Sequence, residues 1–155
     1  MRRRIYADTS AIGGCFDEEF QEPSRLLFDR FQSGLEILIL SSLTLAELEG
    51  APQPVRELLG TLPNGAIEEV SFDREASELG DEYLRAGVIG ARHSADARHI
   101  ATTTVCRVDV LVSWNFRHIV NLDRIHGYNS VNLRNGYNLL EIRSPLEILR
   151  YGNDR

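Results

Sequence analysis

Residues 35–40 read LEILIL, a nearly continuous apolar run that includes two β-branched isoleucines. Runs of this kind are typical of strands buried on both faces, as they are in parallel sheets covered by helices. Strand-like runs also occur at residues 4–7 and 109–113, a shorter one occurs at residues 139–142, and residues 66–72 fit a strand or an extended link. The sequence therefore predicts a sheet of short strands.

Segments with helical periodicity separate these runs. Apolar residues recur at helical spacing over residues 23–31, 44–49, 55–62, 73–86 and 93–105. Because strands alternate with helices across short connections, we predict an α/β/α sandwich around a mainly parallel sheet. No repeat, linker or low-complexity segment divides the 155 residues, so we expect one domain over residues 1–155.

The composition indicates a cytoplasmic protein. Its two cysteines, Cys15 and Cys106, lie far apart in apolar segments without the spacing of a zinc site, so we expect buried, reduced thiols. No apolar run approaches the roughly 18 to 20 residues that span a membrane. The arginines at positions 2–4 precede IYAD instead of the apolar core of a signal peptide. We therefore expect no association with a membrane.

The net charge of −6 is unevenly distributed. Residues 1–82 hold 17 acidic residues and 7 arginines, whereas residues 83–155 hold 6 acidic residues, 10 arginines and all four histidines. The chain has no lysine, and the planar guanidinium of arginine suits bidentate contacts with phosphate. A solvated surface of mixed sign, or a coding bias toward arginine, explains the same pattern. The negative net charge therefore does not exclude a phosphate-containing ligand such as a nucleic acid on the second half of the chain.

Polar residues follow the predicted strands at positions that can meet. Asp8 follows the first strand, residues 41–49 follow the second, and Asn115 follows the strand at residues 109–113. In open α/β sheets, ligands bind beyond the carboxyl ends of the strands. Segments that are far apart in the sequence can therefore converge on one site.

Each acidic residue near these positions also has a local explanation. Asp8 can accept backbone N–H groups at a turn or helix start. Glu47 lies three residues after Thr44, as in a capping box, and Asp96 lies two residues after Ser94, a candidate N-cap. These explanations do not account for three carboxylates that can meet at one edge of a sheet. Such carboxylates repel each other, and Mg²⁺ or Mn²⁺ relieves the repulsion and can activate water for attack on a phosphoryl group.

Four motifs, taken in order, resemble a PIN domain: YADTS at residues 6–10, SLTLAEL at 42–48, DARHIA at 96–101 and DVLVSWNFRHI at 109–119. The resemblance is to the VapC-type toxins of prokaryotic type II toxin–antitoxin pairs, and it spans roughly residues 4–145. No single motif is specific, but the four together in this order make a strong signal. The resemblance implies a PIN-like α/β/α sandwich and a metal-dependent endoribonuclease that hydrolyses RNA.

The resemblance also implies the site and the partners. Asp8, Glu47 and Asp96 would hold Mg²⁺ or Mn²⁺, and Ser10 would support Asp8. Glu49 competes with Glu47 for this role, because residues two apart on a helix point in different directions and only one of them can face the cleft. An antitoxin protein and a homodimer are the implied partners.

The sequence departs from the family at one position. Where many members place an acidic residue after the last motif strand, this chain has Trp114 and Asn115. Asn115 can offer a carbonyl oxygen to a metal-bound water and stays among the catalytic candidates, but it brings no charge and cannot act as a base. Asp109 begins the same strand and should lie at its opposite end.

Four residues in the more basic half of the chain are candidates for contacts with the RNA backbone, namely Arg98, His99, Arg117 and His118. We expect His118 on the surface of a helix, a place where a histidine is more often simply solvated.

Two other functions fit the same residues. With Asn115 in place of an acid, a PIN-like module could bind RNA or protein without cleaving it. A phosphatase with Asp8 as its nucleophile is the third hypothesis, but a haloacid-dehalogenase-like site needs a second aspartate two residues on, where Ser10 stands.

Overall fold

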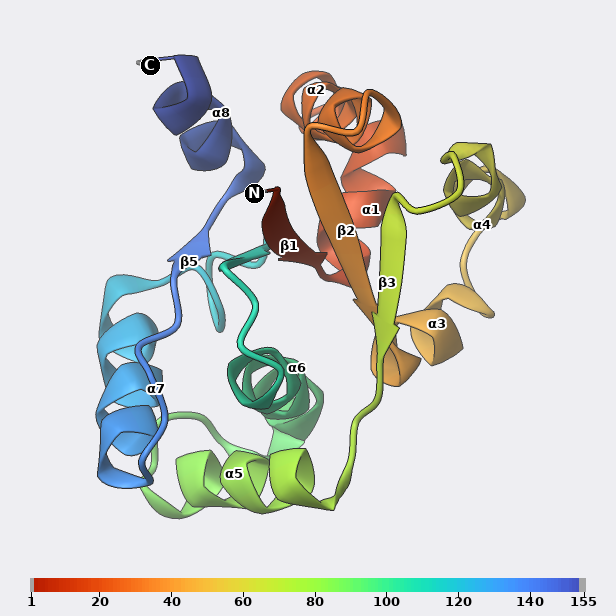
Figure 1. Cartoon of the computed structure of the whole chain (residues 1–155). Coiled ribbons are helices and arrows are strands. Elements are labelled where there is room, and N and C mark those ends of the chain that lie inside the picture. Colours follow the sequence, from red (N-terminus) through yellow and green to blue (C-terminus); the bar gives the residue numbers. More distant parts are fainter. Residues whose placement is uncertain (1, 154–155) are drawn as a thin grey trace.

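Five parallel strands form a sheet in the order β3-β2-β1-β4-β5 (Figure 1). The computed structural model describes residues 2–153. The strands are β1 (Arg3–Ala7), β2 (Glu36–Ser41), β3 (Ile67–Val70), β4 (Val110–Val112) and β5 (Ile142–Arg143). The LEILIL run supplies most of β2, and each neighbouring pair of strands is parallel, which confirms the predicted sheet.

Both faces of the sheet are apolar. Successive residues of a strand point to opposite faces, and in the central strands both sets of residues are apolar. One face carries residues in register from three adjacent strands, namely Ile5, Leu38 and Val110. The opposite face carries the residues that follow them, namely Tyr6, Ile39 and Leu111. Two separate core clusters result, one on each side of the sheet.

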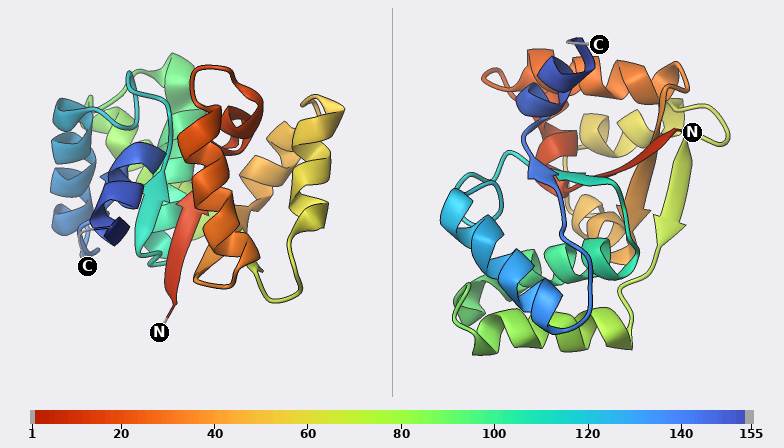
Figure 2. Two further views of the ribbon diagram at one scale, coloured as in Figure 1. Left: turned by 90° about the horizontal axis from the view of Figure 1, so that it is seen from above. Right: turned by 60° about the vertical axis from the view of Figure 1, so that its left-hand side comes forward.

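Helices cover both faces (Figure 2). The face of Ile5 packs against α1 (Thr9–Gly13), α2 (Gln21–Gln32), α4 (Gln53–Leu58) and α8 (Pro145–Asn153). The face of Tyr6 packs against α5 (Arg74–Arg85), α6 (Ser94–Val105) and α7 (Leu122–Arg134). The right-hand view shows the orange helix α2 and the green helix α5 on opposite sides of the strands. The remaining elements are α3 (Ser42–Leu48) and three 3-10 turns, η1 (Gly14–Phe16), η2 (Leu59–Thr61) and η3 (Ala91–His93).

Three helices have no counterpart among the helical segments predicted from the sequence, namely the short α1 and the longer α7 and α8. Helix α7 contains Gly127 and several asparagines, which are poor helix formers. It forms because Asn121 caps its first turn by accepting the N–H of Arg124, and because Tyr128 and Val131 are buried against the sheet. Helix α8 begins with a reciprocal pair of bonds: Ser144 N–H donates to the Glu147 carboxylate, and Glu147 N–H donates to Ser144 Oγ.

Two smaller expectations need correction. The late strand lies at Ile142–Arg143, and Leu139, expected to begin it, is 64% exposed. Cys15 is buried as expected, but Cys106, which caps the end of α6, is only half-buried; both are free thiols. Among residues 2–153, no helix has the length and apolarity needed to cross a membrane.

Candidate active site

The carboxyl ends of β1, β2 and β4 lie at one edge of the sheet because these strands are parallel and adjacent. Asp8 directly follows β1, and Ser113 directly follows β4. Helix α3 begins immediately after β2, so Glu47 lies on the last turn of a helix that starts at the same edge. The sheet therefore brings these segments together, as strand positions in the sequence predict.

Asp8 is buried and held by three hydrogen bonds. Its Oδ1 accepts from Ser10 Oγ at 2.7 Å and from the N–H of Ala11 at 3.0 Å, and its Oδ2 accepts from Ser113 Oγ at 2.6 Å. Asp8 is also the N-cap of α1, which confirms the local explanation from the sequence. Burial raises the pKa of Asp8, and the two hydroxyls and the N–H group oppose that rise without cancelling it.

Glu47 points into the site instead of capping its own helix. The predicted capping box with Thr44 is wrong: the N-cap of α3 is Ser41, whose Oγ accepts the N–H of Thr44 at 3.3 Å. The Glu47 carboxylate instead accepts from Thr9 Oγ1 and lies 2.6 Å from His99 Nε2. Burial raises the pKa of Glu47, but the bonds from His99 and Thr9 outweigh it, so this pKa lies below its ordinary value.

Glu49 is exposed at the end of α3, and its carboxylate makes no hydrogen bond or ion pair with the described residues. Of the two competing glutamates, only Glu47 contacts neighbours from other segments of the site.

His99 is buried in α6 and bonded through both ring nitrogens. Its Nδ1 lies 2.6 Å from the hydroxyl of Tyr6, which also lies 2.7 Å from Ser41 Oγ. Burial raises the pKa of Tyr6 far above its ordinary value, so the hydroxyl keeps its proton. When this hydroxyl donates to Nδ1, Nε2 carries the ring hydrogen and donates to Glu47. The expected contact of His99 with RNA does not suit this position, because neither nitrogen is left for a phosphate.

Asp96 lies in the first turn of α6, as the sequence predicts. Ser94 is the first residue of the helix and not its cap; the N-cap is His93, which makes no side-chain bond to the helix. Burial raises the pKa of Asp96, while the nearby His118, His99 and His93 favour its ionised form. Among the described residues, its carboxylate accepts a single hydrogen bond, a long one of 3.5 Å from Asn115 Nδ2.

Asn115 is oriented opposite to expectation. Its Oδ1 accepts the N–H groups of Arg117 and His118, at 3.2 and 3.0 Å, and its own N–H donates to Ser113 Oγ at 2.9 Å. The side-chain carbonyl thus stabilises the turn at residues 116–119, and the amide NH₂ group faces Asp96. The carbonyl oxygen is therefore not directed toward a metal-bound water.

His118 lies in the turn at residues 116–119, not on a helix, so the expected helical position is wrong. Its ring stacks on that of His93, with centroids 3.7 Å apart and 29° between the ring planes. Burial lowers the pKa of His118, and the neighbouring His93 lowers it further. His93 was not among the site residues predicted from the sequence, although its spacing of three residues from Asp96 places both at the start of one helix.

The carboxylates suit a divalent cation in their chemistry. No described arginine forms an ion pair with Asp8 or Asp96, and Glu47 pairs only with His99. Asp8 is buried, Asp96 is half-buried and Glu47 is exposed, and carboxylate oxygens without an arginine partner are the donors that Mg²⁺ and Mn²⁺ prefer. The donor atoms of Asp8, Glu47 and Asp96 do not all lie within 4.8 Å of one another, so a cation at this site would be held by some of them through its own waters, which Mg²⁺ retains readily.

An aromatic group borders the site beside Asn115. Phe20 stacks on Trp114 with ring centroids 4.3 Å apart, and Phe116 meets Trp114 edge-on at 6.0 Å. Trp114 is anchored by its indole N–H, which donates to Ser24 Oγ at 2.8 Å. Phe116 is 50% exposed, so part of its ring is accessible to solvent beside Asn115 in the chain. The motif that contains Phe116 was noted in the sequence, but this role was not.

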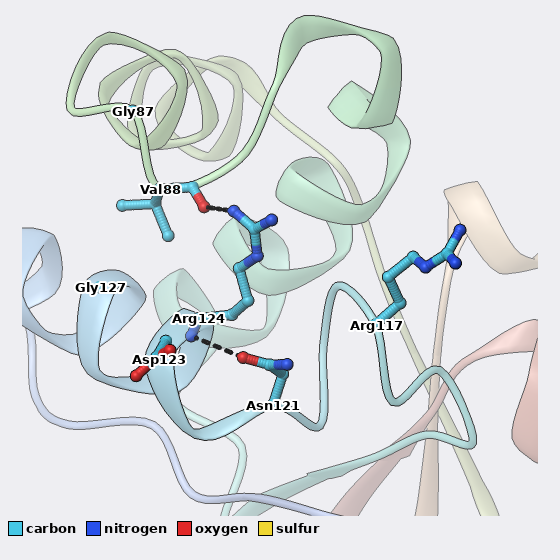
Figure 3. Close-up of a pocket in the computed structure, with 7 residues that line it drawn as sticks. All are labelled: Gly87, Val88, Arg117, Asn121, Asp123, Arg124 and Gly127. Carbon is cyan, nitrogen blue, oxygen red and sulfur yellow. Dashed lines mark hydrogen bonds between the residues drawn. The ribbon is translucent and has the colours of Figure 1, made fainter.

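The two remaining candidates for RNA contacts are exposed arginines. Arg98 lies over the ring of Phe72, 5.7 Å from its centroid. Arg117 lines a hollow of about 560 Å³ together with Arg124, and the close-up shows their side chains on different sides of it (Figure 3). The guanidinium of Arg124 donates to the carbonyl of Val88 and is thereby held in place, whereas Arg117 points away from these groups.

Comparison with known proteins identifies the fold. No family model matches the sequence, and no curated protein matches it. The parallel sheet with acidic residues at its carboxyl edge is the PIN-like α/β/α fold, which confirms the resemblance at the level of structure. Three similar solved structures are VapBC2 from Rickettsia felis bound to a DNA fragment from its promoter, DNA-bound VapBC from Salmonella typhimurium, and FitAcB from Neisseria gonorrhoeae.

The likeness to these structures extends over nearly the whole chain. The TM-scores are 0.58, 0.53 and 0.55, in that order, and the matches cover 91%, 94% and 92% of this chain and 98%, 99% and 98% of the others. The sequence identities are only 14%, 20% and 16%, so the likeness establishes the fold and not the activity.

Proposed function

We propose that this protein is a metal-dependent endoribonuclease of the VapC type. The observation that carries the proposal is the set of carboxylates Asp8, Glu47 and Asp96, which come from three segments and lie at the carboxyl edge of the sheet. Two of them, Asp8 and Asp96, have raised pKa values and no arginine partner among the described residues. Acids with raised pKa values at one site favour a catalytic function.

In this proposal, Asp8 and Asp96 bind Mg²⁺ or Mn²⁺, and Glu47 binds it directly or through a water. The ion would act as a Lewis acid that polarises the phosphodiester and activates water. Ser10 and Ser113 fix the orientation of Asp8 through their hydroxyls. His99 and Thr9 fix the orientation of Glu47 and keep it ionised, so Asp8 and Glu47 are both held by neighbouring side chains before an ion binds.

The surroundings of the site favour single-stranded RNA as the substrate. The exposed ring of Phe116 can stack with an unpaired base, and base–aromatic stacking of this kind tolerates different sequences. Arg98 and Arg117 are exposed and supply candidate contacts with the phosphate backbone. His118 contributes less to this contact, because its ring packs against His93.

We also propose an antitoxin protein as a partner and a homodimer as the assembly. The solved structures with similar folds include VapBC2, VapBC and FitAcB, which supports a paired partner for this chain. Copurification of the full chain with a small protein encoded beside it, and light scattering of the chain alone, test these two proposals separately.

The assay for the proposed function is cleavage of a labelled single-stranded RNA by the purified chain in Mn²⁺. Asp8→Asn should abolish cleavage, and Asp81→Asn, which changes an exposed aspartate on α5, should leave it unchanged. Thermal unfolding of both variants shows whether the fold is intact. Full activity in a folded Asp8→Asn variant would exclude the mechanism.

One observation favours an alternative function. The amide group of Asn115 faces Asp96 at a position where the sequence lacks the fourth acid, and an amide brings no negative charge for a cation. A module of this kind would bind RNA or protein without cleaving it. Calorimetry separates the two functions, because a chain without a competent site shows no Mn²⁺ binding that depends on Asp8.

A further inference from the structure

We propose that His93, Asp96 and His118 form a second metal site, which takes a transition-metal ion of the Zn²⁺ class. The site shares Asp96 with the carboxylates but has its own nitrogen ligands. It does not require the chain to cleave RNA, so it can be tested independently of the proposed function.

The three residues come together from three local structures. His93 ends the turn η3, Asp96 lies in the first turn of α6, and His118 lies in the turn that follows β4. One ligand atom of each lies within 4.8 Å of the other two, and they are the only trio of histidine, cysteine, aspartate or glutamate side chains among the described residues to do so. Each of the three is half-buried, so an ion can reach them while part of its water is excluded.

The ligand atoms have few competing partners. His118 Nδ1 is buried and has no hydrogen-bond partner among the described residues, an arrangement that usually has an explanation such as an ion or a water. Asp96 accepts only the long bond from Asn115. A cation bound to both groups would satisfy them at once. Because an imidazole binds a metal through a lone pair in its ring plane, the rings of His93 and His118 would turn out of their stacked arrangement to share the ion.

Neighbouring hydrogen bonds fix the turn that carries His118. Asn115 Oδ1 accepts the N–H of His118, and the hydroxyl of Tyr128 donates to the His118 carbonyl at 2.8 Å. Tyr128 is fully buried in α7, so this anchor is rigid. Supporting bonds of this kind hold ligands in position in metal sites. They also give Asn115 a role that differs from that of the missing acid: it positions a histidine ligand.

The donor set selects the kind of ion. Two imidazole nitrogens and one carboxylate oxygen suit Zn²⁺, Co²⁺ and Ni²⁺, whereas Mg²⁺ prefers oxygen donors alone. Two histidines and one carboxylate, with a further position open to water, is also a ligand set found in zinc enzymes. Mg²⁺ should therefore bind this site far more weakly than Zn²⁺.

The test is titration of the metal-free full chain with Zn²⁺ by calorimetry and with Co²⁺ by visible absorption. Wild type should bind one ion through these residues, and His93→Ala and His118→Ala should each weaken that binding by about 100-fold or more, since even supporting partners of metal ligands are worth about 10- to 100-fold. His126→Ala is the matched control, because His126 is exposed on α7 and outside the trio, and it should bind as wild type does. Asp8→Asn should keep Zn²⁺ binding while losing RNA cleavage, which separates this site from the proposed nuclease.

A second readout uses wild type alone and does not depend on how the variants fold. In side-chain NMR spectra, Zn²⁺ should shift the imidazole signals of His93 and His118 strongly but not those of His126, and the same concentration of Mg²⁺, which binds Asp96 without binding the ring nitrogens, should shift the signals of His93 and His118 far less. The proposal is overturned if wild type binds no Zn²⁺ at micromolar concentration, or if the signals of His93 and His118 do not respond to the bound ion.

Discussion

The Nε2 atom of His99 lies 2.6 Å from the Oε1 atom of Glu47, although 52 residues separate them in the sequence. This pair joins α6 to α3 across the carboxyl edge of the sheet, and the hydroxyl of Tyr6 extends the chain of hydrogen bonds into β1. A candidate metal ligand is thus oriented by a buried histidine whose own orientation is fixed by a buried tyrosine. Four predictions follow from such contacts.

The first prediction compares two substitutions at His99. In His99→Gln the amide nitrogen stands near the position of Nε2 and can still donate to Glu47, whereas in His99→Asn it stands near Nδ1 and cannot. We expect His99→Asn to lower Mn²⁺-dependent cleavage about 10- to 100-fold, the usual effect of losing a partner of a metal ligand, and His99→Gln to lower it less. Equal losses in the two variants, at equal thermal stability, would show that His99 acts only through the fold.

The second prediction concerns pH. Burial raises the pKa of Asp8, so the folded protein holds a proton on this group at pH values where the unfolded chain has lost it. Without a metal, the contribution of Asp8 to stability is therefore greatest below the ordinary aspartate pKa and falls as the pH rises through the raised value. Asp96 shifts in the same direction, again because of burial.

A bound cation needs these carboxylates ionised, so the stabilisation by Mn²⁺ should grow with pH over the same range. Melting temperatures measured with and without Mn²⁺ across this range check the prediction. In Asp8→Asn the increase on adding Mn²⁺ should be small at every pH. A Mn²⁺ effect that is independent of pH would contradict the assignment of Asp8 as a ligand.

The third prediction concerns the exposed ring beside the site. Phe116→Ala should raise the KM for single-stranded RNA by about 5- to 150-fold, which corresponds to the loss of one stacked base at about 1 to 3 kcal/mol, with kcat little changed. Leu133→Ala, which removes an exposed apolar side chain on α7, is the control and should leave KM unchanged. An unchanged KM in Phe116→Ala would remove base stacking from the proposal.

The fourth prediction concerns the close approach of α7 to the turn before η3. A Cβ atom at Gly127 would lie 2.7 Å from Val88 Cγ1, so Gly127→Ala should destabilise the fold by about 1 to 3 kcal/mol, against the gain of roughly 1 kcal/mol normal for this change in a helix. Urea unfolding measures the effect. Val88→Ala should restore part of the loss in a double-mutant cycle, and additive effects of the two changes would contradict the contact. Gly60→Ala, with no atom within 4 Å of the new Cβ, is the control.

The sequence predicts the sheet better than it predicts the last helices. The LEILIL run reveals a strand buried on both faces because its period is visible locally. Helix α7 has no such local pattern. Its Gly127 lies against Val88, and its buried Asn132 accepts a hydrogen bond from Tyr83 of α5, so both residues serve contacts with distant segments. Helix α8 does carry a local signal, the spacing of Ser144 and Glu147 in a capping box, so this helix is predictable from the sequence.

The same division applies to the site. The positions of Asp8 after a strand and of Asp96 at the start of a helix are confirmed, because a strand end and a helix start are local features. The pairing of His99 with Glu47 and the stacking of His93 on His118 depend on how α6 packs against neighbouring segments, and no spacing in the sequence encodes that packing. The orientation of Asn115 was misjudged for a related reason: its side chain caps a turn whose geometry appears only in the structure.

The most direct test of the central claim is the rate of Mn²⁺-dependent cleavage of single-stranded RNA by the Asp96→Asn variant. Of the three carboxylates Asp8, Glu47 and Asp96, Asp96 accepts the fewest hydrogen bonds, so its substitution should disturb the fold least. We predict that wild type and the Glu49→Gln control cleave the RNA, and that the folded Asp96→Asn variant does not. Cleavage by Asp96→Asn at the rate of wild type would contradict a metal-dependent nuclease built on these carboxylates.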